Sequence, residues 1–166
     1  NGPLWYQDYT LGGMQYGARQ LFAAVTHYYQ DHPGVKLLVT PSWTNGADAV
    51  ASFFLPEGAP VEMGSIEGHI FQRLPLDDQM VFVVIPNELE KVQSSGKFED
   101  VQIEQIIKYP NGKPGFYFVR LQYVPEIEAI LEAERESRRA LLETRLAIDG
   151  YGTLVRYPVL DMGSIE

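Results

Sequence analysis

The stretch Met80-Val81-Phe82-Val83-Val84-Ile85 is an unbroken run of apolar residues, most of them β-branched or aromatic. Such a run, closed by Pro86, predicts a strand that is covered on both faces. A second short run at 35–40, bounded by Pro33-Gly34 and Pro41, has the same character. Strands buried on both faces need helices on both sides of their sheet, so the two runs predict the central parallel strands of an α/β domain.

Helical patterns surround these two strands. Apolar residues recur every three or four positions between Met14 and Tyr29, which predicts a first helix. Asn45 with Asp48 resembles a capping box and predicts a helix that ends before 56–60. Asn87 is the predicted cap of a further helix, with Glu90 at its third position. Residues 69–72 have the composition of an additional strand.

The pattern changes to a period of two beyond Val101. Alternating residues at 101–109 and 117–123 flank Pro110-Asn111-Gly112, which predicts an antiparallel hairpin. A long helix is expected from Pro125 to about Leu142, followed by a last short hairpin over 146–157. The whole pattern predicts a three-layer, Rossmann-like α/β sandwich with a mixed sheet and an antiparallel hairpin extension. We expect a single domain at 12–160, preceded by a segment at 1–11 and followed at 161–166 by the start of a linker.

Composition limits the function classes. The 166 residues contain 13 basic and 22 acidic side chains, a net charge of −9, and no cysteine. The negative balance argues against nucleic acid and anionic lipid as partners. The lack of cysteine removes thiol catalysis, disulfides and Cys-ligated zinc. Since His27, His32 and His69 have no metal-ligand spacing, we expect no metal site and no cofactor.

The polar loop Thr40-Pro41-Ser42-Trp43-Thr44-Asn45 is the predicted ligand site. It follows a central strand and precedes a helix, and ligands of open α/β sheets bind at that edge. Ser42, Thr44 and Asn45, with Asn87 from the next strand end, suit sugar hydroxyls, and Trp43 would supply an apolar platform. The alternative is that these side chains only form the turn and cap the helix.

Signatures of nucleotide binding and acid–base catalysis are not complete in the sequence. Gly12-Gly13 does not continue into the G-x-G-x-x-G spacing, and there is no Walker lysine. The acidic pairs Asp77-Asp78 and Glu99-Asp100 are expected to be solvated turns. Glu62-Met63-Gly64-Ser65-Ile66-Glu67 returns at 161–166 with Asp161 in place of Glu, and it has no chemical role that we can assign.

Three phrases resemble a known family. They begin with Asp8-Tyr9-Thr10-Leu11-Gly12-Gly13, Pro75-Leu76-Asp77-Asp78-Gln79-Met80 and Tyr109-Pro110-Asn111-Gly112-Lys113-Pro114-Gly115. This pattern resembles the soluble carboxyl-terminal region of bacterial multi-span glycosyltransferases, which are related to the protein O-mannosyltransferase and aminoarabinose transferase families. The resemblance implies a parent enzyme that takes sugar from a polyprenyl phosphate carrier. It also implies that the catalytic acidic residues lie outside this chain.

The resemblance therefore predicts a non-catalytic accessory domain on the extracytoplasmic face of the membrane. The expected partners are the membrane-spanning part of the same chain and a glycan, and the aromatic segment with Leu4, Trp5, Tyr6 and Tyr9 would follow the last span. Two alternatives remain open from the residues themselves. One is a small Rossmann-like enzyme that binds a sugar nucleotide, and the other is a structural or protein-interaction module.

Overall fold

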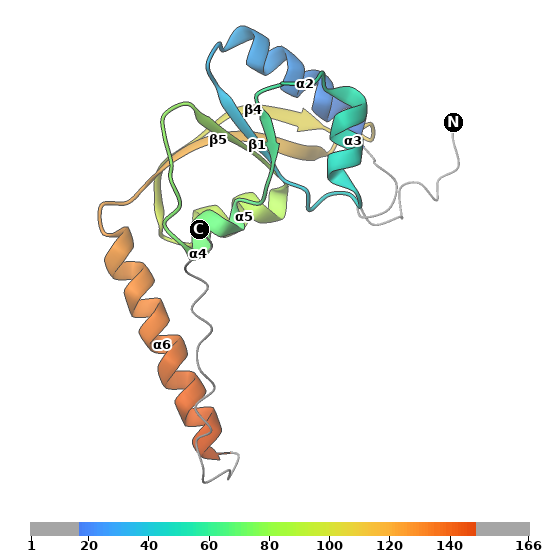
Figure 1. Ribbon diagram of the computed structural model, residues 1–166. Helices are drawn as coiled ribbons and strands as arrows, with labels where there is room; N and C mark the ends of the chain where they lie inside the picture. The colour runs from blue at the N-terminus through green and yellow to red at the C-terminus, as the bar shows by residue number, and fades with distance from the viewer. Residues whose placement is uncertain (1–16, 149–166) are drawn as a thin grey trace. The chain divides into compact units, whose positions relative to one another are not determined.

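A five-strand mixed sheet is the centre of the fold (Figure 1). The computed structural model describes residues 17–148, with side chains through residue 142. The strand order is β2-β1-β3-β5-β4, with β1, β2 and β3 parallel and β5 antiparallel to both β3 and β4. The strands are β1 (Lys36–Val39), β2 (Val61–Met63), β3 (Met80–Val84), β4 (Phe98–Lys108) and β5 (Pro114–Tyr123). The predicted parallel pair and the predicted hairpin are both confirmed.

Helices cover both faces of the sheet and make the three predicted layers (Figure 1). On one face lie α2 (Ala18–Asp31) and α3 (Ala47–Phe54), and on the other lie α4 (Glu67–Phe71) and α5 (Pro86–Ser94). Side chains alternate along β3, so Val81 and Val83 join the core under α2 and α3. Phe82 and Val84 join the core under α4 and α5. This double burial is why β3 has no polar position.

The helix α6 (Ile127–Ile148) is longer than the sequence predicted. It contains Leu146 and Ile148, so the assignment of these two residues to a last hairpin is wrong. A continuous run of helix formers with Glu early and Arg late explains the extension, because no glycine or proline interrupts it before Gly150. The remainder of that predicted hairpin, like the segment at 1–11 and Met14, lies outside the described residues. From Glu128 onward the chain belongs to a second compact unit.

Three local predictions are corrected by the structure. Residues 69–72 do not form a strand, because residues up to Phe71 lie in α4. Ile70 in this helix and Ile66, which directly precedes it, are buried one turn apart. The α3 helix begins at Ala47 after Gly46, whose φ is 65°, so Asn45 is not its cap. The α5 helix begins at Pro86, which makes Asn87 an exposed residue of the first turn.

No helix within residues 17–148 is both long and apolar enough to cross a lipid bilayer.

Candidate functional site

The carboxyl ends of β1 and β3 lie side by side at one edge of the sheet. The chain leaves β1 for α3 on one face and leaves β3 for α5 on the other face. A change of direction of this kind separates the loops after two neighbouring strands, and in doubly wound sheets it marks the usual place for a ligand. The predicted convergence of the loop after β1 with the start of α5 is therefore present in the fold.

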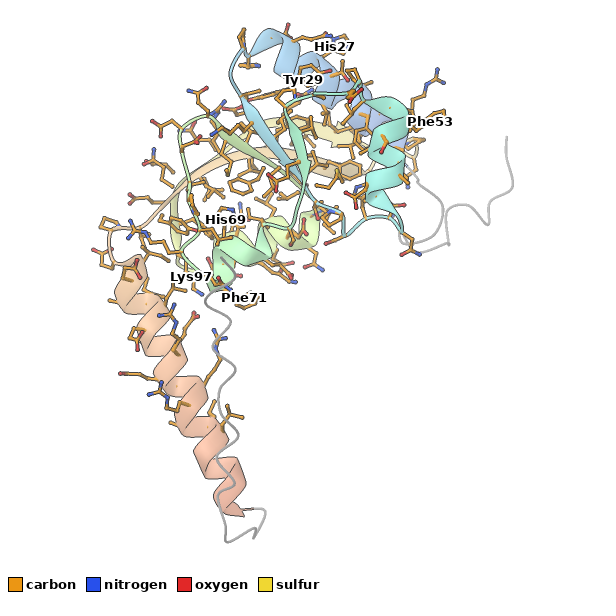
Figure 2. The ribbon with its side chains drawn as sticks, viewed as in Figure 1. His27, Tyr29, Phe53, His69, Phe71 and Lys97 are labelled. Atoms are coloured by element: carbon orange, nitrogen blue, oxygen red, sulfur yellow. The ribbon has the colours of Figure 1, made fainter. Side chains whose placement is uncertain are left out.

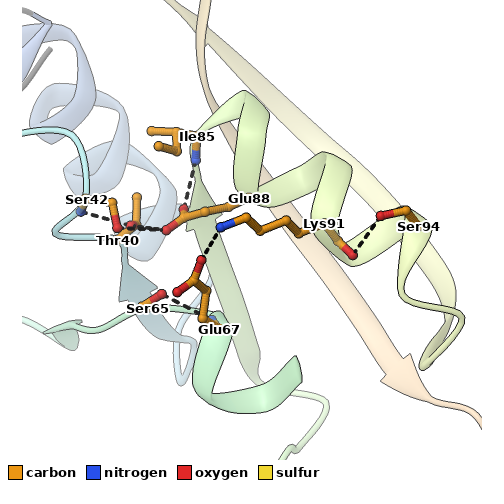
Figure 3. Close-up of polar contacts among 8 residues, drawn as sticks. All are labelled: Thr40, Ser42, Ser65, Glu67, Ile85, Glu88, Lys91 and Ser94. Carbon is orange, nitrogen blue, oxygen red and sulfur yellow. Dashed lines mark hydrogen bonds and ion pairs between the residues drawn. The ribbon is translucent and has the colours of Figure 1, made fainter. Parts of the chain in front are cut away.

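A buried carboxylate joins the two strand ends (Figure 3). Glu88, only 2% exposed, accepts hydrogen bonds at Oε1 from Thr40 Oγ1 at 2.6 Å and from Ser42 Oγ at 3.0 Å. Its Oε2 accepts the backbone N–H of Ile85 at 3.2 Å. The Ser42 backbone N–H donates in turn to Thr40 Oγ1 at 3.1 Å.

These hydrogen bonds to Glu88 hold the loop after β1 in place rather than form a catalytic site. Each Glu88 oxygen has at least one donor from the protein itself, which compensates the cost of removing a carboxylate from water. Ser42 is exposed, but its hydroxyl hydrogen is directed at a carboxylate rather than at an imidazole base. Serine nucleophiles of the Ser-His-Asp type use an imidazole base that a third group orients, whereas the hydrogen-bond partners of Ser42 within the described residues are Glu88 and Thr40.

An ion pair lies near this edge and connects α4 with α5 (Figure 3). Lys91 Nζ contacts Glu67 Oε1, and the Glu67 backbone N–H donates to Ser65 Oγ at 3.1 Å. The hydrogen bond that Lys91 donates to the Glu67 carboxylate raises the pKa of Lys91. Both side chains remain accessible to water, so the pair positions α4 and α5 at small energetic gain.

The predicted ligand residues separate into exposed and buried groups. Ser42, Asn45 and Asn87 are exposed at the carboxyl edge. Thr44 is buried, and its hydroxyl donates to the Asn45 carbonyl oxygen at 3.4 Å. Asn45 and Asn87 are exposed amides, and Ser42 Oγ, which donates to Glu88, keeps only its acceptor capacity for a ligand, whereas Thr44 serves the turn.

Trp43 is a core residue. Its side chain is fully buried, edge-on to Phe116 with ring centroids 5.4 Å apart and tilted against Phe22 at 6.3 Å. The ring therefore cannot be the exposed stacking platform that the sequence predicted, and a direct effect of Trp43→Ala on oligosaccharide binding is no longer expected. Its loop turns back over the α2 and α3 face, which carries the indole inward. Within the described residues, no acceptor meets the Trp43 Nε1 hydrogen.

The sequence interpretation did not identify Glu88, although a signal was present. Proline is favoured at the first helical position, so Pro86 marks the start of α5 and puts Glu88 at the third. A glutamate there reaches back to the N–H that precedes the helix. With Asn87 as the predicted cap, the third helical position falls on Glu90 instead.

The other polar groups are separated from this edge. His27 is exposed on α2, and His69 is buried in α4 (Figure 2). Asp77 accepts the Gln79 backbone N–H at 2.9 Å and pairs with Lys36, which lowers the pKa of Asp77. Within the described residues, no group of three or more His, Asp or Glu side chains has an arrangement that could hold a metal ion.

Comparisons with protein-family models, curated proteins and solved structures find no match to this chain. The fold and the edge at Glu88 define it as an α/β domain with a mixed five-strand sheet.

Proposed function

We propose that this chain is a non-catalytic, extracytoplasmic accessory domain of a polyprenyl-phosphate-sugar-dependent membrane glycosyltransferase. The three sequence phrases support the family, and Glu88 supports the accessory role. At the edge where α/β enzymes react, this buried carboxylate bonds to Thr40, Ser42 and Ile85 of its own chain. Its hydrogen-bonding capacity maintains the fold, and the parent enzyme would supply the reacting groups.

The same edge is unfavourable for a sugar nucleotide. Phosphates bind helix N-termini through free backbone N–H groups and the positive end of the helix dipole. Here the first turn of α3 carries Asp48 and the first turn of α5 carries Glu88. The Glu88 carboxylate already occupies the Ile85 N–H. Two carboxylates at the two helix starts repel a diphosphate, which weighs against the enzyme alternative.

A glycan remains the ligand proposed for the exposed residues of the edge. The Asn45 and Asn87 amides can donate to and accept from sugar hydroxyls, and Ser42 Oγ, whose hydrogen is directed at Glu88, can accept from one. With Trp43 in the core, recognition would rest on hydrogen bonds, and the affinity of one such contact set would be low.

Calorimetric titration tests the non-catalytic part of the proposal. The 166-residue chain is titrated with UDP-glucose, GDP-mannose and ATP, and we expect no binding in the micromolar range. Micromolar binding of any one of them would overturn the accessory role in favour of the nucleotide-sugar enzyme.

The full-length gene product tests the parent enzyme. We expect upstream apolar segments of about 20 residues each, the length that spans a bilayer. Membranes that contain the full-length protein should transfer sugar from a polyprenyl phosphate donor, and the Glu88→Gln protein that remains folded should retain that turnover. Loss of turnover with the fold intact would make Glu88 a reacting group, and the absence of upstream spans would remove the glycosyltransferase assignment.

A further inference from the structure

A groove lies at the opposite side of the sheet from the hairpin, between α3 and the edge strand β2. It encloses about 630 Å³ and is lined by residues of α3, of the loop 56–60 and of β2. Its apolar part includes Ala51 from the helix, Leu55 directly after it, and Val61 and Met63 from the strand. The groove is separate from the Glu88 edge, whose hydrogen-bonded residues do not line it.

The outer side of β2 has hydrogen-bonding capacity that the described strands leave unused. β2 is the last strand of the sheet on this side and pairs only with β1. Leu37 N–H donates to the Pro60 carbonyl at 3.0 Å, and Gly64 N–H donates to the Val39 carbonyl at 2.9 Å. Because backbone groups alternate along a strand, the N–H and carbonyl of Met63 point away from β1, towards the open side.

The negative charges that line the groove favour a basic partner. Asp48, Glu57 and Glu62 line it and are exposed, and no Lys, Arg or His is among its lining residues. A second copy of this chain would bring the same three carboxylates opposite themselves, which is unfavourable. An extended segment with basic side chains would gain both the backbone pairing and the attraction.

We propose that β2 and α3 form a docking groove for an extended, Lys- or Arg-containing segment of a partner protein, which adds to the sheet as a strand beside β2. Apolar side chains of the segment would contact Leu55, Val61 and Met63. Its basic side chains would lie near Asp48, Glu57 and Glu62. This inference stands independently of the proposed glycosyltransferase assignment.

The first experiment follows the binding residue by residue. An acetylated, amidated hexapeptide of alternating Val and Lys is titrated into the ¹⁵N-labelled 166-residue chain. We expect saturable shifts concentrated between Asp48 and Gly64, with slower hydrogen exchange at the Met63 amide in the complex. Absence of saturable binding up to millimolar peptide, or shifts centred elsewhere, would overturn the proposal.

Modified peptides separate strand addition from simple charge attraction. N-methylation of alternate residues removes backbone donors without changing the charge. Two such peptides are compared, one methylated at the odd positions and one at the even positions, and we expect one of the two to lose binding. A peptide of alternating Val and Glu should not bind. Equal binding of the parent peptide and both N-methylated peptides would contradict strand addition.

Charge reversal in the protein provides the matched control. Glu57→Lys combined with Glu62→Lys should weaken binding of the Val-Lys peptide roughly tenfold, the scale of two exposed ion pairs converted to repulsion. Glu90→Lys, at an exposed position of α5 on the other face, makes the same charge change per residue and should alter the affinity much less. Equal weakening per substituted residue would mean that only the net charge of −9 attracts the peptide, which overturns the groove.

Discussion

Glu88 shows how one buried side chain can determine the shape of a loop. A carboxylate in a protein interior is unfavourable unless donors surround it. Thr40, Ser42 and Ile85 supply those donors from two different strand ends. The loop after β1 is thereby attached to the start of α5, and the attachment depends on one residue.

Removal of Glu88 should therefore be costly. Glu88→Ala leaves the three donors without their acceptor and is expected to lower the free energy of unfolding by about 2 to 4 kcal/mol. Glu88→Gln keeps the volume and part of the hydrogen bonding, so we expect a smaller loss. Urea denaturation of both variants is the measurement, with Glu90→Ala on the exposed side of α5 as control. A loss no larger than that of the control would contradict the structural role.

His69 makes the stability of the fold depend on pH. It is 4% exposed, its Nδ1 lies 3.1 Å from the Tyr123 hydroxyl, and its ring is edge-on to Phe82. Burial lowers the pKa of His69 below its ordinary value of 6.5. The folded state therefore binds a proton less readily than the unfolded state does. The resulting stabilisation is complete above pH 6.5 and is lost as the pH falls towards the lowered pKa.

The expected result is a stability that declines as the pH falls below about 6.5, with a slope of at most ~1.4 kcal/mol per pH unit from this residue. His69→Gln should remove that part of the slope, whereas His27→Gln, at an exposed position of α2, should leave it unchanged. The measurement is the free energy of unfolding in urea at several pH values. Equal slopes in the wild type and in His69→Gln would show that His69 is not its source.

At this scale the sequence predicted some roles and missed others. It located the loop at 40–45 correctly, because a polar stretch between a buried strand and a helix is a local pattern. It could not predict the burial of Trp43, which depends on Phe22 and Phe116 from distant parts of the chain. It also missed Glu88, of whose three donors only the Ile85 N–H is local, because Thr40 and Ser42 become its neighbours only when β1 and β3 pair.

At the scale of elements, the start of α2 packs closely against the end of the hairpin. Gly17 precedes α2 with a φ of 87°, and a Cβ there would lie 2.7 Å from the Tyr109 ring. Gly115 meets the same ring from β5, with a Cβ distance of 2.8 Å. Two glycines thus make room for one aromatic side chain, and this close contact sets where α2 begins relative to β4 and β5.

Gly17→Ala tests this contact against a matched glycine. Gly112, in the hairpin turn, has a φ of 83°, but a Cβ there would meet nothing within 4 Å. Alanine at either position has an unfavourable left-handed conformation, which costs about 1 to 2 kcal/mol. Gly17→Ala should cost a further ~1 to 3 kcal/mol because of the clash with Tyr109. Thermal or urea unfolding compares the two variants, and equal losses would contradict the packing argument.

The elements differ in how far the sequence alone can predict them. β1, β3 and the hairpin can be predicted because continuous or alternating apolar residues indicate buried strands. β2 cannot be, since a three-residue strand has too short a pattern and forms by pairing with β1. The incorrect prediction of a strand at 69–72 has a similar cause, because the five residues of α4 are too few to repeat a helical period. The conformation there is decided by the burial of Ile66 and Ile70 against the sheet.

At the scale of the whole molecule, the two compact units differ in how they are stabilised. The first has two apolar cores, one on each face of the sheet, and every residue of β3 from Val81 to Val84 is buried. In α6, the side chains from Glu132 to Leu142 are exposed with the exception of Glu134. Ion pairs there join Arg135 to Glu132 at 3.0 Å and Arg138 to Glu134 at 3.3 Å. Pairs of this kind stabilise a helix only slightly.

Hydrogen exchange should therefore separate the two units. The amides of β3 open only when the sheet unfolds, whereas those between Glu132 and Leu142 can open by local unfolding of a polar helix. We expect the β3 amides to exchange more slowly by at least about two orders of magnitude, measured by exchange in D₂O at neutral pH. Raising the ionic strength should speed exchange in this part of α6, because salt screens its ion pairs, and should leave β3 almost unchanged. Protection of these α6 amides equal to that of β3 would show instead that this helix unfolds only together with the sheet.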